Sequence, residues 1–301
     1  MEKRRGMLYG AAAYGLWGTF PIYWPLLEPA GAIELLAHRI LWSAITMSLL
    51  VLLLRRGPSL RALVADRRTF LILSVAALVI TFNWGGYIWG VTNGRVVETS
   101  LGYFINPLVT VLMGVFVLGE RLRPGQWAAL GLGALAVAIL TLDYGRPPWI
   151  ALLLAFSFGT YGLAKKKADA PAIESLTLET LLIAPLAAGY LVWLSADGGS
   201  GFTQHGAGHV LLFMSTGIVT AVPLVMFSAA ATRVPMVALG LLQYLAPILQ
   251  FALGVLYFHE DMPAGRWIGF VLVWLALMVF TIESLRHRRQ HLRLAAESAA
   301  L

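Results

Sequence analysis

Four ionisable residues lie inside long apolar stretches of this 301-residue chain, and they are the first candidates for chemistry. Glu34, His38 and Arg39 stand close together at the start of one stretch, and Glu179 lies in another. An ionisable group in an apolar stretch is costly, so it is kept where it gates, binds an ion or carries a proton. We therefore predict charge, gating or proton-coupling roles for these four residues, with Glu34 and His38 as an i,i+4 pair.

Two of these residues also allow a purely structural role. Arg39 lies only about 7 Å from the edge of its stretch at about 1.5 Å per helical residue, so its side chain can snorkel to the surface. If its charge is used instead, its partner is Glu34 or an anionic solute. Glu179 can pair with the lysines at 165–167.

Two prolines sit beside polar residues in the middle of apolar stretches. Pro107 and Pro247 each remove a helical hydrogen bond, which predicts a kink and a free carbonyl four residues earlier. Amide and phenol groups next to a free carbonyl favour a substrate-binding surface, and these residues are Tyr103, Asn106, Gln243 and Tyr244. The alternative is that the prolines only kink their helices and that Asn106 joins two helices.

The stretch 82–94 (FNWGGYIWGVTNG) contains three further candidates for substrate binding. Asn83 and Tyr87 share one helix face, and Trp84 adds aromatic surface. Trp89, nearer the end, is expected in an interfacial aromatic belt. The glycines at positions 86, 90 and 94 form a stripe that favours close helix packing, either within the chain or in a homodimer.

Composition indicates which elements position these residues. The chain is 59% hydrophobic and 12% charged, with a mean hydropathy of +0.77 and no cysteine. Such a composition predicts an all-α integral membrane protein in the lipid bilayer. The apolar stretches predict ten transmembrane helices at about 8–27, 35–54, 70–92, 100–118, 126–143, 149–164, 176–194, 210–230, 238–258 and 266–284.

The basic residues set the orientation. With a cytoplasmic N-terminus, nearly all Lys and Arg residues fall in the inner loops and tails; the exceptions are Arg39, Arg95, Arg146 and Arg266. This bias predicts that both termini are cytoplasmic. It also explains the net charge of +7 without nucleic acid. The longest loops are 55–69 and the Gly-rich 195–209, which we expect to be a flexible outer loop.

The second half of the chain repeats the first at an offset of 140 residues. The repeated positions include Pro107 and Pro247, Gly114 and Gly254, Glu120 and Glu260, Gly125 and Gly265, and Trp127 and Trp267. Near the chain start, residues 18–20 match 159–161 at an offset of 141. The same relation pairs Arg39 with Glu179. We predict five-helix repeats at 1–145 and 146–285 and a basic cytoplasmic tail at 286–301.

Five helices per repeat is an odd number, so the second repeat must be inverted relative to the first. Inverted repeats are a recurring architecture of secondary transporters, whose site lies near the midplane between the repeats. Enzyme motifs are not found: the sequence has no H-E-x-x-H, G-x-S-x-G or P-loop. We therefore expect no catalytic residues, no metal site and no cofactor. The glutamates at 98, 120 and 260 are expected to be capping or loop charges.

Several ordered motifs, covering about residues 7–284, resemble one family. In the first half these are His38-Arg39, Asn83-Trp84, residues 100–108 (SLGYFINPL) and residues 118–121 (LGER); in the second half they are residues 155–158 (AFSF), Glu179-Thr180, residues 217–220 (GIVT), Pro223 and residues 229–233 (AAATR). The chain resembles the RarD-type transporters in the EamA branch of the drug/metabolite transporter superfamily. One departure is the sequence His-Glu-Asp at 259–261, where the first repeat has Gly-Glu-Arg.

The resemblance implies ten helices in two inverted repeats in the bacterial inner membrane. It also implies export or exchange of a small-molecule substrate, either a metabolite or a drug-like molecule. We accordingly expect alternating access by a secondary transporter. Two other functions stay open. A lipid flippase or scramblase would have a lateral groove open to lipid, and a non-transporting scaffold would show no stabilisation by solutes.

Overall fold

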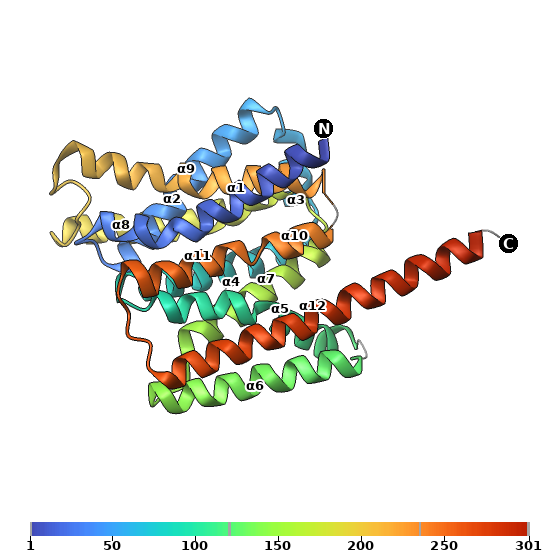
Figure 1. The fold of residues 1–301 in the computed structure, drawn as a ribbon. Coiled ribbons are helices and arrows are strands. Elements are labelled where there is room, and N and C mark those ends of the chain that lie inside the picture. Colours follow the sequence, from blue (N-terminus) through green and yellow to red (C-terminus); the bar gives the residue numbers. More distant parts are fainter. Residues whose placement is uncertain (1, 120–121, 235, 300–301) are drawn as a thin grey trace.

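The computed structural model describes residues 2–119, 122–234 and 236–299, without the side chains at 117–118, 231, 236–237 and 288–299. All regular elements in these residues are helical. They are α1 (Glu2–Tyr23), η1 (Trp24–Leu27), α2 (Ala32–Leu53), α3 (Gly57–Ala65), α4 (Arg67–Thr92), α5 (Val96–Leu118), α6 (Pro124–Tyr144), α7 (Trp149–Ala168), α8 (Ala172–Ala196), α9 (Gly206–Ala231), α10 (Met236–Leu242), α11 (Leu245–Ala252), η2 (Leu253–Tyr257) and α12 (Ala264–Ala299) (Figure 1).

Each of the ten predicted apolar segments coincides with helix. Eight helical segments among the described residues are long and apolar enough to cross a membrane: α2, α4, α5, α6, α8, α9, α10 to η2, and α12. The other two segments, α1 and α7, are more polar. α1 is rich in glycine and tyrosine, and α7 ends in the lysines at 165–167.

Two local expectations were wrong. The predicted loop 55–69 contains the short helix α3. The ninth segment is not one helix, because α10 ends at Leu242 and α11 begins at Leu245. The tenth segment falls within the candidate span Ala264–His287, and the α12 backbone stays helical beyond it, through the predicted tail to Ala299.

Local sequence sets several helix ends. Asp66 caps α4 by accepting a hydrogen bond from the backbone N–H of Arg68 (3.1 Å). Gly119 and Gly145 end α5 and α6 with positive φ angles of 67° and 63°. Only glycine adopts this conformation without steric cost, so these helices stop where the chain must reverse.

The principal contacts between the two halves of the chain come in matched pairs. α1 packs on α9 and α11, and correspondingly α7 packs on α4 and α5. α2 packs on α9, and α8 packs on α4. The pairs α2–α8, α5–α11 and α6–α12 are their own counterparts. These principal contacts between the halves are therefore unchanged when the halves are exchanged.

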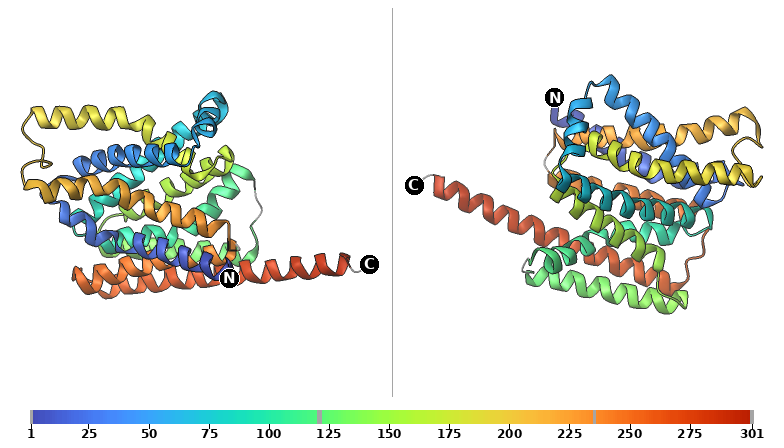
Figure 2. Two further views of the ribbon diagram at one scale, coloured as in Figure 1. Left: turned by 90° about the horizontal axis from the view of Figure 1, so that it is seen from above. Right: turned by 180° about the vertical axis from the view of Figure 1, so that it is seen from behind.

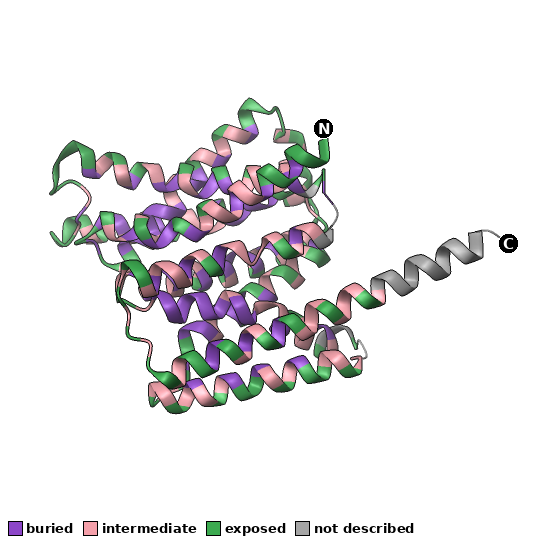
Figure 3. Cartoon of the chain, viewed as in Figure 1, coloured by how far each residue is buried: buried purple, intermediate pink, exposed green. Residues whose placement is uncertain are grey.

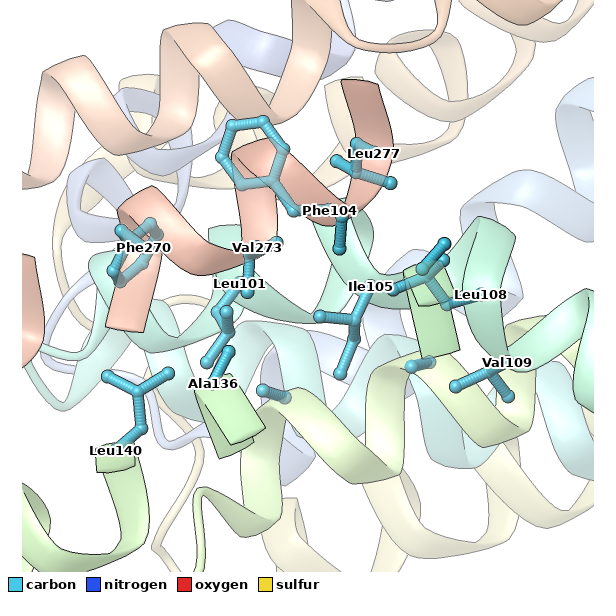
Figure 4. Close-up of a cluster of buried hydrophobic side chains, with 14 of the residues drawn as sticks. Leu101, Phe104, Ile105, Leu108, Val109, Ala136, Leu140, Phe270, Val273 and Leu277 are labelled. Atoms are coloured by element: carbon cyan, nitrogen blue, oxygen red, sulfur yellow. The ribbon is translucent and has the colours of Figure 1, made fainter. Parts of the chain in front are cut away.

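The α6–α12 pair runs along one edge of the bundle in all views (Figures 1 and 2). Burial is concentrated in the helices on its inner side (Figure 3). The largest apolar cluster joins α5 to α6, α7 and α12, and includes Leu101, Phe104, Leu140 and Phe270 (Figure 4). Both chain ends lie at the same end of the bundle (Figure 1).

Candidate functional site

Arg39 is buried in the bundle, with 5% of its surface exposed. Its Nε–H donates to Thr220 Oγ1 on α9 (3.2 Å). The guanidinium lies over the rings of Trp84 (4.1 Å), Trp24 (5.2 Å) and Phe20 (5.9 Å). These side chains come from α1, η1, α2, α4 and α9, so Arg39 is enclosed by protein and does not snorkel.

Three tyrosines complete these surroundings. Tyr23, Tyr87 and Tyr103 lie within electrostatic range of the Arg39 charge. The rings of Tyr87 and Tyr103 meet edge to face at 5.8 Å. The Tyr23 hydroxyl is hydrogen-bonded to Leu212 O (2.8 Å), whereas the buried Tyr87 hydroxyl has no partner in the described part of the chain.

The structure thus brings together four residues that were predicted from the sequence: Arg39, Trp84, Tyr87 and Tyr103. Phe20, Trp24, Tyr23 and Thr220 were not predicted. Phe20 carried a usable signal, since it lies in the repeated string at 18–20. We call the assembled group the Arg39 cluster: Arg39, Trp84, Tyr87 and Tyr103, with Phe20, Trp24, Tyr23 and Thr220.

Glu34 and His38 lie apart from the Arg39 cluster and do not pair with each other. Glu34 Oε1 accepts from Ser200 Oγ (3.0 Å) and from Gly201 N (2.8 Å). His38 stacks on Phe202 at 4.6 Å, and both its ring nitrogens are buried without a partner among the described residues. The i,i+4 pair and the pairing of Arg39 with Glu34 were therefore wrong. The segment 200–202 is held against α2, contrary to the expected flexible loop.

Glu179 is satisfied by its own half of the chain. Its Oε1 accepts from Lys165 Nζ (2.7 Å) and its Oε2 from the Tyr161 hydroxyl (2.9 Å). Lys165 also donates to Ser175 Oγ. The pairing with a lysine at 165–167 is confirmed.

The internal repeat relates these two buried charges. Arg39 and Glu179 are 140 residues apart. Phe20 and Trp24, which flank Arg39, correspond at an offset of 141 to Tyr161 and Lys165, which bind Glu179. Equivalent positions therefore hold an arginine among aromatic rings in one half and a closed ion pair in the other.

The other predicted site residues have different surroundings. Asn83 Nδ2 donates to Leu154 O (3.0 Å) and Ser157 Oγ (2.9 Å), so it joins α4 to α7. Tyr244 packs on the large apolar cluster that joins α5 to α6, α7 and α12, and it faces Thr281. Asn106 is half-buried one turn beyond Tyr103, and its Oδ1 has no donor among the described residues. Gln243 is half-buried in the break between α10 and α11.

The two prolines differ in effect. α5 continues through Pro107, whereas the chain is interrupted at 243–244, just before Pro247. Two glycines of the predicted stripe serve packing within the chain: a Cβ on Gly86 would meet Leu153 at 2.6 Å, and one on Gly90 would meet Thr99 at 2.5 Å. Gly94 does not belong to the stripe, because it follows the end of α4 with a φ of 63° and has nothing within 4 Å of an added Cβ. Trp89 packs on Trp149 with ring centroids 5.0 Å apart.

Charged groups at the opposite end of the bundle from the termini fasten helices together. Glu98 pairs with Arg146 (2.7 Å) and accepts from Ile150 N (3.1 Å). The hydrogen bond that Arg146 donates to Glu98 raises the pKa of Arg146. Glu260 accepts from the first amides of α5, including Val97 N (3.0 Å), while burial raises its pKa. The capping role is confirmed for Glu98 and Glu260, and Glu120 lies outside the described residues.

These features describe an all-helical, multi-pass membrane protein. A family model described as the EamA-like transporter family matches residues 4–142 and again 147–282. The chain belongs to this family; it is a membrane transporter, not an enzyme. The two matches fall on the two halves defined by the repeat.

Bacterial relatives extend the similarity over nearly the whole chain. "Protein RarD" of Streptomyces exfoliatus is 56% identical over 98% of this chain and 94% of its own length. "Uncharacterized transporter YojE" of Bacillus subtilis is 40% identical over 96% and 97%. A solved structure described as "Crystal structure of protein" shares the fold, with a TM-score of 0.60, 21% identity and coverage of 93% of this chain and 98% of its own.

Proposed function

We propose that this protein is a secondary active transporter that exports or exchanges small metabolites or drug-like molecules by alternating access. The observation that carries the proposal is that the principal contacts between the two halves are preserved when the halves are exchanged. A molecule built from two equivalent halves can adopt two related conformations, one open to each side of the membrane.

In this proposal ten helices cross the bacterial inner membrane as two inverted repeats, at 1–145 and 146–285. α1, α2, α4, α5 and α6 form the first repeat, and α7, α8, α9, the α10–α11 segment and α12 form the second. The basic loops and the location of both termini at one end of the bundle support cytoplasmic termini and a cytoplasmic tail at 286–301.

The substrate pathway lies between the halves, lined by α1, α4 and α5 and by their counterparts α7, α9 and α10–α11. The Arg39 cluster lies on this path, because Arg39 on α2 reaches Thr220 on α9. Asn106 and Gln243 extend the proposed binding surface along α5 and into the break before α11. Glu179 and its partners occupy the equivalent position in the second half, where they support a gating role.

Flux measurements test this function directly. Proteoliposomes are loaded with a metabolite mixture, with and without an imposed pH gradient. We expect selective loss of one solute, and we expect Asn106→Ala and Gln243→Ala to slow it. Unchanged flux in both variants would remove these residues from the site, and no flux of any solute from folded protein would contradict the function.

One observation favours a second candidate, a lipid flippase or scramblase. An apolar surface recess of about 200 Å³ lies between α2, α4 and the start of α7, and it is lined by Ala32, Ile33, Leu36, Gly85, Gly86, Trp89 and Trp149. A lipid-handling protein needs such a lateral groove. A scrambling assay with labelled headgroups separates the candidates, since only the lipid-handling protein moves labelled lipid between leaflets.

A further inference from the structure

We propose that Arg39 is the anchor of a binding site for small organic monoanions, whose apolar body packs on the surrounding aromatic rings. The inference rests on the proposed transport function and names the chemical class of its cargo. It is carried by an unneutralised buried charge and, independently, by an unpaired buried hydroxyl.

The charge of Arg39 lacks a protein counter-ion. Its Nε–H is taken by Thr220, and no carboxylate in the described residues pairs with the guanidinium. The acidic groups nearest in sequence or in the repeat are already engaged: Glu34 with the segment 200–201, and Glu179 with Lys165. A buried charge without a partner is strongly unfavourable, so a bound anion would complete the site.

The geometry of the guanidinium favours an oxyanion. With Nε used by Thr220, its two terminal nitrogens form no hydrogen bond with the described residues. Two parallel N–H groups on a planar guanidinium match the two oxygens of a carboxylate or sulfonate. A spherical ion such as chloride offers one acceptor atom to the two N–H groups, so it matches this planar geometry less well.

Tyr87 supplies the second observation. Only 2% of its surface is exposed, its hydroxyl has no hydrogen-bond partner among the described residues, and it lies within electrostatic range of Arg39. A buried O–H group without an acceptor is costly. An oxyanion on Arg39 has lone pairs left to accept a hydrogen bond from this hydroxyl, so one ligand would satisfy both groups.

Charge and surroundings narrow the class further. The Arg39 cluster offers one positive charge, so a monoanion neutralises it, whereas a dianion would leave a buried negative charge. The rings of Phe20, Trp24 and Trp84 around the guanidinium are apolar surface. An organic body packs favourably against such surface, and an inorganic anion does not use it.

Binding to the purified full-length chain tests the proposal. The probes are benzoate and benzenesulfonate, with the neutral benzamide and benzenesulfonamide of similar shape and with sodium chloride. The readouts are the thermal unfolding midpoint and the tryptophan fluorescence, since Trp24 and Trp84 flank the site. We expect both organic anions to raise the midpoint and change the fluorescence, and neither neutral compound nor chloride to do so.

Two variants and a matched control locate the site. Arg39→Gln should weaken binding of the organic anions by more than about tenfold, because a charged hydrogen-bonded contact is lost. Tyr87→Phe should weaken it by about three- to tenfold without lowering the unliganded midpoint, because the hydroxyl bonds to no described residue. The control is Arg95→Gln. It also removes an arginine that lies over a tryptophan ring, that of Trp89, but outside the Arg39 cluster, so this variant should bind the anions as wild type does.

Three results would overturn the proposal: equal effects of chloride and benzoate, wild-type binding by Arg39→Gln, or wild-type binding by Tyr87→Phe. If Arg39→Gln does not fold, the binding measured for Tyr87→Phe still tests the proposal. A flux assay separates this inference from the proposed function. If a neutral solute is transported and no organic anion binds, transport stands and the cargo class is wrong. If the anions bind as expected and no solute moves, the anion site stands and transport is wrong.

Discussion

Arg39 and Glu179 occupy equivalent positions in the two halves, yet among the described residues only Glu179 has a counter-ion. Glu179 has a lysine and a tyrosine within 3 Å of its oxygens, at 2.7 and 2.9 Å. Arg39 has aromatic rings and one threonine. The comparison teaches that a duplicated scaffold can place opposite charges at matching sites and give them different tasks. We infer that the Glu179 ion pair stabilises the fold and serves in gating, whereas Arg39 is left to bind a ligand.

The largest effect is expected from breaking the ion pair between Lys165 and Glu179 in the second half. Lys165→Met leaves the Glu179 carboxylate, 1% exposed, without its counter-ion. We expect the free energy of unfolding to fall by about 3–5 kcal/mol, because an unpaired buried charge remains. Thermal or denaturant unfolding in detergent measures the change.

The matched controls sharpen the comparison. The double variant Lys165→Met, Glu179→Leu removes both charges and should recover most of the lost stability. Arg39→Met, without ligand, should be at least as stable as wild type, because it removes a buried charge that has no counter-ion among the described residues. Equal losses in Lys165→Met and Arg39→Met would show that both halves use their charges structurally.

The next effect is expected from forcing apart α2 and α9, which hold the Arg39 cluster. A Cβ on Gly217 of α9 would collide with the backbone carbonyl of Trp42 on α2. Gly217→Ala should cost about 1–3 kcal/mol through overpacking and should also weaken anion binding, because α2 carries Arg39 and α9 carries Thr220. Gly15→Ala on α1 is the control, since nothing lies within 4 Å of its added methyl group. Wild-type unfolding and binding in Gly217→Ala would contradict this close approach.

A smaller effect is expected at Asn83, and it distinguishes a packing residue of α4 from a binding residue. Asn83 and Trp84 are neighbours, but Asn83 joins α4 to Leu154 and Ser157 of α7, whereas Trp84 faces Arg39. Asn83→Ala should lower the free energy of unfolding by about 1–3 kcal/mol through lost buried hydrogen bonds. Anion affinity should not change. A variant that unfolds like wild type but binds anions more weakly would return Asn83 to the binding site.

The smallest effect concerns Glu260, at the opposite end of the bundle from the termini. Burial raises its pKa in the folded state above the ordinary value of 4.5, despite the amides of Val96 and Val97. A carboxyl group with a raised folded pKa stabilises the fold most when protonated, so its contribution falls as pH rises from the unfolded to the folded pKa. Wild type should therefore lose slightly more stability than Glu260→Gln between pH 4.5 and pH 7. Parallel unfolding curves for the two proteins would contradict the pKa shift.

Much of the fold could be predicted from the sequence because hydropathy and repetition are local properties. The ten apolar segments coincide with helices, and the offset of 140 paired Arg39 with Glu179 before any contact was known. Residues 165–167 also predicted the partner of Glu179, although sequence could not choose among three adjacent lysines. That choice depends on the rotation of α7, which places Lys165 toward α8.

The Arg39 cluster was only half predictable, because contacts between distant helices leave no local signal. Trp84, Tyr87 and Tyr103 could be selected by type and position, whereas Trp24 and Thr220 reach Arg39 only through the packing of η1 and α9. The partner of Glu34 was mispredicted for the same reason, since its donors come from the distant segment 200–201. The two prolines looked equivalent in the repeat. However, α5 continues through Pro107, whereas the chain breaks between α10 and α11, just before Pro247.

The most direct test of the account is flux of a permanently charged monoanion under a membrane potential. Benzenesulfonate does not leak as a neutral acid, and its outward movement is favoured by about 2.3 kcal/mol for each 100 mV of inside-negative potential. Proteoliposomes loaded with it receive a potassium gradient and valinomycin. We predict that an inside-negative potential speeds its loss through wild type and Arg95→Gln, and that Arg39→Gln shows no such flux. Equal flux through Arg39→Gln, or no movement through folded wild-type protein, would contradict the account.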